Sequence, residues 1–234
     1  MASGWWDNSG AISGCVAAYQ PIGAASLAAS YVNLQNPGVY DCAPGTAPTF
    51  ATATGWTFTG TQWLTVTGLS AAAKPVTIIA RATFDSIADY RTIVGASGNG
   101  GAHFYLSKDT SKIDFTKGAV AAIGSSTGTY SLSTEYVVAI TYGSAGAFAF
   151  YRNGSSDGVG TVNQTFTATT VNIGAFSSGA LYRMSGKIAA LAIYHAGLTA
   201  GQIATLSASM AALPIVPRGL PIIAHYHHAV FGGG

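Results

Sequence analysis

The chain is poor in charged residues, and this excludes some partners. Among 234 residues only 8% are charged, with ten Lys and Arg against eight Asp and Glu, for a formal net charge of +2. Average domains carry about 25% charged residues. Without a basic run to neutralise phosphates, we expect no nucleic-acid partner. A surface with so little charge repulsion fits either contact with other proteins or simply a neutral, stable β domain, and both interpretations stay open.

Acidic residues are too few and too scattered for common hydrolytic chemistry. Glu135 is the only glutamate, and no two acidic residues stand two positions apart. Glycoside hydrolysis normally uses two carboxylates that flank the scissile bond. We also expect no serine nucleophile of the elbow type, and we interpret His103 and His195 as structural. The sequence therefore favours a protein that is not an enzyme.

Long apolar runs are absent although 49% of the residues are hydrophobic. No stretch of about 18 apolar residues is free of polar interruption, so we expect no membrane span. The residues from Met1 to Asp7 lack the basic and apolar regions of a secretory signal, so we expect none. Two cysteines, Cys15 and Cys42, either pair or are small buried thiols. We favour reduced thiols because no export signal is expected.

Short strands separated by glycine-rich turns make up the middle of the sequence. In Val76–Phe84 and Tyr136–Tyr142 apolar side chains alternate with others, the period of a half-buried strand. Turns rich in Gly, Asn and Ser supply the positive φ angles of hairpins. About a dozen such strands predict an all-β sandwich or barrel. The expected strands are Cys15–Tyr19, Gly55–Phe58, Gln62–Thr65, Val76–Phe84, Arg91–Gly95, His103–Leu106, Lys112–Phe115, Ala119–Gly124, Tyr136–Tyr142, Phe148–Arg152, Val162–Phe166, Val171–Gly174 and Lys187–Tyr194.

One helix is expected, near the end of the sandwich. Ile203, Leu206 and Met210 recur at helical spacing within 199–213. Thr199 can cap the start of this helix, and Pro214 stops it.

Both ends of the chain are apolar outside the expected sandwich. The tail 214–234 contains three prolines yet is rich in Ile, Leu, Val and Phe, whereas a free disordered tail is polar. We therefore expect extended arms at 1–14 and 214–234 around a sandwich at 15–213, with the arms gripping neighbouring subunits. The alternative is that the tail packs on its own domain. The expected contact residues are Trp5, Trp6, Ile215, Leu220, Ile222, Ile223, Tyr226 and Phe231.

Two weak candidates for metal binding remain. His225 and His227 lie on one face of an extended chain, as zinc or another transition metal requires, although histidines packing at an interface explain them more simply. Asp85 and Asp89 share one loop and could hold Ca²⁺ through their oxygens, although solvated loop residues are the simpler interpretation. We expect no cofactor, with calcium as the one alternative.

Several segments in a fixed order carry a resemblance to a known family. They are Val16–Tyr19, Gly55–Leu64, Val76–Ala80, Phe150–Gly154, Val171–Gly174, Ser185–Tyr194 and Leu198–Ile203. This order, from Val16 to Leu206, resembles the laminin G-like branch of the concanavalin A-like superfamily. The resemblance implies a jelly-roll β-sandwich with one short C-terminal helix. Many members bind Ca²⁺ through loop carboxylates, and the scarcity of acidic residues here departs from that pattern.

The fold carries lectins, hydrolases, adhesion modules and virion proteins, so function needs a separate argument. Low charge and apolar ends fit the laminin G-like proteins of bacteriophage structural modules. We expect a capsid decoration or tail-associated protein at the virion surface, with sister subunits and other virion proteins as partners. The alternative is a carbohydrate-binding or adhesion module for cell-surface glycans. That alternative predicts an aromatic patch facing solvent on one sheet or at the loop tips.

Overall fold

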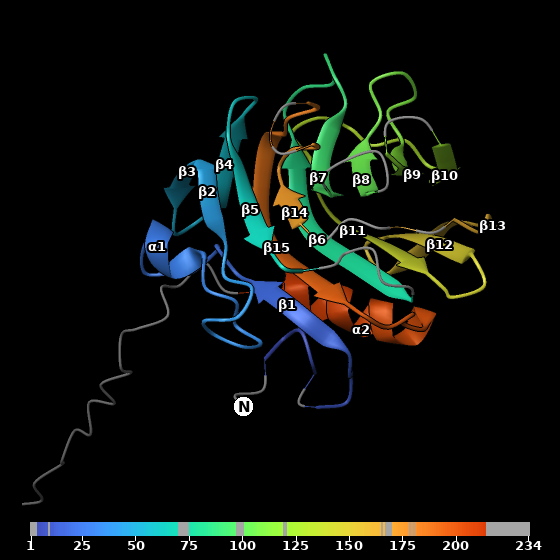
Figure 1. Ribbon diagram of the computed structural model, residues 1–234, viewed down its shortest axis with the longest axis horizontal. Coiled ribbons are helices and arrows are strands. Elements are labelled where there is room, and N and C mark those ends of the chain that lie inside the picture. Colours follow the sequence, from blue (N-terminus) through green and yellow to red (C-terminus); the bar gives the residue numbers. More distant parts are fainter. Residues whose placement is uncertain are drawn as a thin grey trace, which may run out of the picture.

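Two antiparallel β-sheets stacked face to face form the body of the protein (Figure 1). The computed structural model describes residues 4–8, 10–69, 75–96, 101–118, 121–164, 166, 170–177, 179 and 181–213. The all-β sandwich expected from the sequence is confirmed. In these ranges no helix has the length and apolar character needed to cross a bilayer.

The first sheet, called sheet A, contains eight strands. In spatial order the strands are β13 (Ser155–Thr161), β12 (Ala147–Arg152), β11 (Glu135–Tyr142), β6 (Val76–Phe84), β15 (Ser185–Tyr194), β4 (Gly55–Thr59) and β3 (Thr49–Ala51), with β1 (Cys15–Tyr19) also paired to β15. Its central strands β11, β6 and β15 are the longest in the molecule, and most of their residues are buried.

The second sheet, called sheet B, contains seven strands. Non-consecutive strands lie side by side in both sheets, as the crossing connections of a jelly roll require. In spatial order they are β10 (Ala121–Ser125), β9 (Ile113–Lys117), β8 (Ala102–Leu106), β7 (Arg91–Ala96), β14 (Thr170–Ile173), β5 (Trp63–Thr67) and β2 (Ala43–Thr46).

The main core lies between the sheets and follows from the period of two. On β6, Ile78, Ala80, Ala82 and Phe84 all point into this core and are at most 1% exposed. The shared face expected for these four residues is confirmed. Burying each large apolar side chain contributes roughly 1.5–3 kcal/mol. Trp56 of β4 is fully buried in the same core, and its Nε1 donates to Ser30 Oγ at 2.7 Å, at the end of α1 (Leu27–Ser30).

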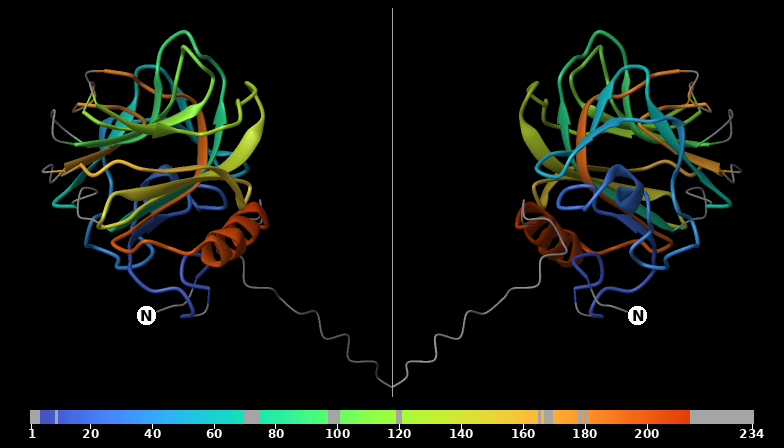
Figure 2. Two further views of the ribbon diagram at one scale, coloured as in Figure 1. Left: turned by 90° about the vertical axis from the view of Figure 1, so that its right-hand side faces the viewer. Right: turned by 90° about the vertical axis from the view of Figure 1, so that its left-hand side faces the viewer.

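A second apolar layer covers the outer face of sheet A. Helix α2 (Ala200–Ala211) begins with a capping box between Thr199 and Gln202 and buries Ile203, Leu206 and Met210 against the sheet. The expected helix is confirmed with its cap. Figure 2 shows α2 and the N-terminal segment together on this side of the sandwich, with β7 and β8 on the opposite side.

The N-terminal segment folds onto the same layer instead of extending from it. Trp5 and Trp6 are 8% and 3% exposed within the single chain. Trp6 Nε1 donates to Gln35 Oε1 at 2.6 Å, and the Tyr194 hydroxyl donates to Trp6 O at 2.7 Å. The expectation of an extended arm at 1–14 is therefore corrected for its described residues. The outer face of sheet A is apolar, and the two indoles cover it; contact between these indoles and another subunit stays a prediction.

Several strand assignments differ from the sequence expectation. Strand β13 was not expected, because Ser155–Thr161 is rich in Ser and Gly and poor in strand formers. It forms because Asn153 and Gly154 adopt φ angles of 52° and 83°, which close a tight hairpin with β12. The strand expected at Val162–Phe166 does not form at 162–164. Short strands β2 and β3 and helix α1 were also not expected.

Candidate functional site

The outer face of sheet B carries an aromatic floor built by β8. Because Phe104 and Leu106 point into the core, the alternate residues His103 and Tyr105 point outward. The two rings stack with centroids 4.0 Å apart, and Phe176 stacks on His103 with centroids 4.5 Å apart. His103 is 1% exposed, and its Nε2 lies 2.7 Å from Thr92 Oγ1. Burial lowers the pKa of His103 to about 3, so the imidazole is neutral near neutral pH.

Two further tyrosines reach this floor from loops. Tyr90 precedes β7 and Tyr182 precedes β15. The ring of Tyr90 meets those of Tyr105 and Tyr182 edge to face, with centroids 5.4 Å and 5.0 Å apart. All three tyrosines are partly exposed, so a ligand can reach them from solution. Tyr90, Tyr105 and Tyr182 are called the tyrosine cluster below.

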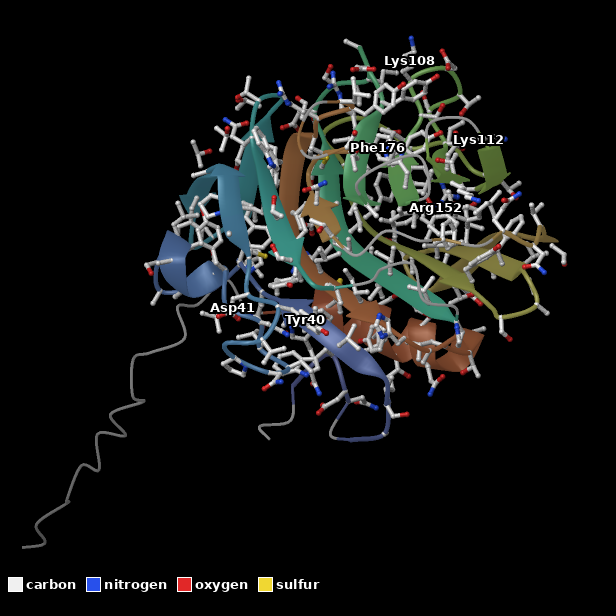
Figure 3. All side chains as sticks on the ribbon, viewed as in Figure 1. Tyr40, Asp41, Lys108, Lys112, Arg152 and Phe176 are labelled. Atoms are coloured by element: carbon white, nitrogen blue, oxygen red, sulfur yellow. The ribbon has the colours of Figure 1, made fainter. Side chains whose placement is uncertain are left out.

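Charged groups hold Tyr90 in place. Its hydroxyl donates to Asp109 Oδ2 at 2.6 Å, and Lys108 Nζ lies 5.4 Å from the ring centroid. The hydrogen bond to Asp109 raises the pKa of Tyr90 to about 12, because the carboxylate stabilises the protonated phenol. Figure 3 places Lys108 and Phe176 at one end of the molecule, away from Tyr40 and Asp41. The cluster therefore lies at a rim of sheet B.

The loop that supplies Phe176 and Tyr182 crosses the outer face of sheet B closely. A Cβ on Gly95 of β7 would lie 2.7 Å from Ala175 O and 3.0 Å from Phe176 Cα. Phe176 and Leu181 pair across the loop as an isolated bridge, with hydrogen bonds in both directions. Glycine at position 95 thus lets the loop approach the sheet closely enough for Phe176 to stack on His103.

A small recess adjoins the tyrosine cluster through Tyr182. It has a volume of about 180 Å³ and is called the arginine recess, after two of its lining residues. Its lining residues are Gly60, Asp89, Arg91, Leu181, Tyr182 and Arg183. Leu181 is 46% exposed and forms an apolar rim. Aromatic faces beside fixed hydrogen-bonding groups in a shallow recess are suited to a flat, polar ligand such as a sugar ring.

The predicted calcium residues Asp85 and Asp89 lie in the loop between β6 and β7. Asp89 lines the arginine recess, whereas the backbone N–H of Asp85 donates to Ser185 O at 2.9 Å. Within the described ranges, no three His, Cys, Asp or Glu side chains come together as a metal site. The candidates His225 and His227 lie outside the described residues. The predicted contact residues of the tail also lie outside the described residues; they are Ile215, Leu220, Ile222, Ile223, Tyr226 and Phe231.

Both cysteines are free thiols. Burial raises the pKa of Cys15 to about 12 and that of Cys42 further, so neither is an activated nucleophile. Cys15 borders a second and larger recess of about 400 Å³. That recess also contains Gln35, Asn36 and Tyr40, so it too places an aromatic ring beside hydrogen-bonding side chains.

One serine motif that was not expected is present at 124–128. Gly124-Ser125-Ser126-Thr127-Gly128 has the glycine, any residue, serine, any residue, glycine spacing of a nucleophile elbow. Ser126 is 1% exposed; its Oγ accepts from Ile113 N at 3.0 Å and donates to Gly128 O at 3.0 Å. It follows strand β10 and is not followed by a helix. The motif therefore ties a loop to β9 and does not present a nucleophile.

Comparison with known proteins identifies the class. Residues 58–204 match the sequence profile of a laminin G family described as "Concanavalin A-like lectin/glucanases superfamily". The match covers more than half of the chain, and the chain belongs to this superfamily. A search of curated proteins found no match.

Solved structures share the fold at low sequence identity. Domain 4 of AbnA, a GH43 extracellular arabinanase from Geobacillus stearothermophilus, was solved in complex with arabinotriose; it is 14% identical, with a TM-score of 0.64 over 83% of this chain and 98% of that one. Trypanosoma rangeli sialidase is 18% identical, with a TM-score of 0.61 over 87% of this chain. An HCR/D mutant is 13% identical, with a TM-score of 0.64 over 83% of this chain and 51% of that one. This chain spans only 33% of the length of the sialidase chain.

Proposed function

We propose that this domain binds carbohydrate through the tyrosine cluster and does not cleave it. The observation that carries the proposal is the meeting of three partly exposed tyrosine rings from separate segments at the rim of sheet B. This is the solvent-facing aromatic patch that a carbohydrate-binding module requires. The similarity to an arabinanase domain solved with arabinotriose supports the proposal.

Three of the eight acidic residues hold protein groups in place, which favours binding over catalysis. Asp109 is engaged with Tyr90, and Asp157 accepts from the Tyr130 hydroxyl at 2.7 Å. Glu135 pairs with Arg81 Nε at 2.8 Å on the strands of sheet A. A glycosidase needs two carboxylates that are free to face the sugar. These three instead hold protein groups in place.

Mutation of the cluster tests the proposal. The full chain is screened on a glycan array, and the bound glycans are then measured by calorimetry with Tyr90→Ala and Tyr182→Ala. Each variant should weaken binding at least about fivefold, because stacking of one aromatic ring contributes about 1 kcal/mol or more. Tyr40→Ala is the matched control, since Tyr40 lies at the other recess (Figure 3).

Three outcomes would contradict the proposal. If no glycan bound, the proposed carbohydrate-binding function would be wrong. Loss of binding in Tyr40→Ala, with the cluster variants unaffected, would move the site to the recess beside Cys15. Release of reducing sugar from a bound glycan would overturn the non-catalytic part.

The virion function expected from the sequence stays a prediction. Its strongest sequence argument was the apolar tail, and residues 214–234 lie outside the described residues. The virion function is tested by measuring whether the full chain and a version that ends at Leu213 bind to a virus particle. A carbohydrate-binding domain and a virion surface protein are compatible, so this test does not bear on the tyrosine cluster.

A further inference from the structure

The two guanidinium groups of the arginine recess are fixed by different partners. Arg91 is 9% exposed. Its Nε donates to Ser86 O at 3.0 Å, Nη1 to Arg183 O at 3.0 Å, and Nη2 to Ser86 Oγ at 3.1 Å. All three acceptors are uncharged. A guanidinium has five N–H groups, so two of those on Arg91 remain for a ligand.

Arg183 is held by one bond and one ring. Its Nε donates to Gly179 O at 2.6 Å, and its guanidinium carbon lies 5.5 Å from the centroid of Trp63. The indole ring supports the flat face of the guanidinium, so little side-chain entropy is lost when the group binds a ligand. Both terminal nitrogens, with four N–H groups, remain for hydrogen bonding. Two arginines whose guanidinium groups are held in place therefore line one recess.

Carboxylates do not balance these two charges. In the described ranges the arginines that pair with a carboxylate within 4.0 Å are Arg81, with Glu135, and Arg152, with Asp157. Asp89 is the one carboxylate that lines the recess. Burial lowers the pKa of Arg91, and the charge of Asp89 opposes this effect only in part. A buried cation without a matching anion is costly, and an anion that enters the recess offsets that cost.

We infer that the arginine recess receives the carboxylate of an acidic sugar, so that the site prefers uronic or sialic acids to neutral sugars. The inference rests on the proposed glycan-binding function and specifies its ligand. The sugar ring would lie against Tyr182, which belongs to both the cluster and the recess. Its carboxylate would accept from the free N–H groups of Arg91 and Arg183, in the geometry that favours guanidinium over ammonium groups.

Glycan pairs that differ only in charge test this inference. The probes are oligogalacturonate against its methyl ester, and sialyllactose against lactose, measured by calorimetry with the full chain. At least one acid should bind about tenfold more tightly than its neutral counterpart, the contribution of one charge-assisted hydrogen bond. A higher salt concentration should weaken binding of the acidic sugar and leave binding of the neutral sugar unchanged.

Variants assign the preference to the recess. Arg183→Gln should bring the affinity for the acidic sugar close to that for its neutral counterpart. Asp89→Asn should increase the ratio of the two affinities, because the recess becomes more positive. Lys187→Gln is the control, since it removes one positive charge from sheet A. Arg91 is left intact because its hydrogen bonds tie two loops together.

The outcomes separate the two proposals. Equal affinity for acid and neutral sugars, with Tyr90→Ala still abolishing binding, would overturn the acid preference and leave the glycan site intact. A preference that survives Arg183→Gln would overturn the role of the recess. Failure of every glycan to bind would overturn both proposals.

Discussion

The imidazole of His103 lies on the phenol ring of Tyr105, with centroids 4.0 Å apart and ring planes inclined by 27°. The opposite face of the imidazole contacts Phe176, 4.5 Å away between centroids. This stack keeps the ring out of water, and the resulting low pKa makes it a neutral support for the tyrosine cluster. The stability of the fold should therefore depend on pH through this residue.

We predict that His103 destabilises the fold as the pH falls below about 6.5. The pKa of His103 is about 3 in the folded protein and near 6.5 when unfolded. Between these pH values His103 is protonated in the unfolded state but not in the folded state. The free energy of unfolding therefore falls by up to about 1.4 kcal/mol for each unit by which the pH is lowered. His103→Phe keeps the stack and removes the titration. Urea unfolding from pH 4 to pH 7 should show a shallower slope for this variant; an unchanged slope would refute the assignment.

The bond from Tyr90 to Asp109 gives a second prediction. Asp109→Asn should bring the pKa of Tyr90 from about 12 back toward 10, because the neutral amide no longer favours the protonated phenol. Titration of the tyrosine ring signals by NMR measures this change, and Tyr90→Phe identifies the signal. The same pKa in wild type and Asp109→Asn would mean that the bond does not persist in solution.

Gly95 gives a third prediction, which links the sheet to the site. In Gly95→Ala the added Cβ meets the backbone of the loop at Ala175 and Phe176, so the loop must move away. We expect a loss of about 1–3 kcal/mol in the free energy of unfolding, together with weaker glycan binding. Urea unfolding and calorimetry measure the two effects.

Gly201 provides the matched control for that variant. It lies in the first turn of α2, and a Cβ there has no atom within 4 Å. Gly201→Ala should leave glycan binding unchanged and stabilise the helix by up to about 1 kcal/mol. Equal effects of the two substitutions would show that the approach of the loop to Gly95 is unimportant.

The long central strands could be predicted from the sequence because both of their faces are constrained. Val76–Phe84 was predicted with the bounds that the structure shows, since its alternation reports the core directly. The glycine-rich strand β13 could not be predicted in this way, because a hairpin turn and not its own side chains places it. Capping of α2 by Thr199 follows local rules and was predicted.

The site was less accessible to sequence reasoning. Alternation on β8 is the local signal in the sequence that places His103 and Tyr105 on the side away from the core. Tyr90 and Tyr182 belong to loops, and no local pattern shows that they meet. Trp5 and Trp6 illustrate a related limit. Their apolar character showed that they are covered, but it did not distinguish a neighbouring subunit from the outer face of sheet A.

The apolar layer on sheet A also fixes how the domain can be displayed. Trp5 near the start of the described chain and Leu213 at its end both belong to this layer, on the side away from sheet B (Figure 2). A bead, surface or fusion partner joined directly after Leu213 would therefore lie behind the sandwich and leave the tyrosine rings facing solution. Many copies anchored in this way would present their sites in parallel, so a weak single contact with a polysaccharide could become firm attachment through multivalency.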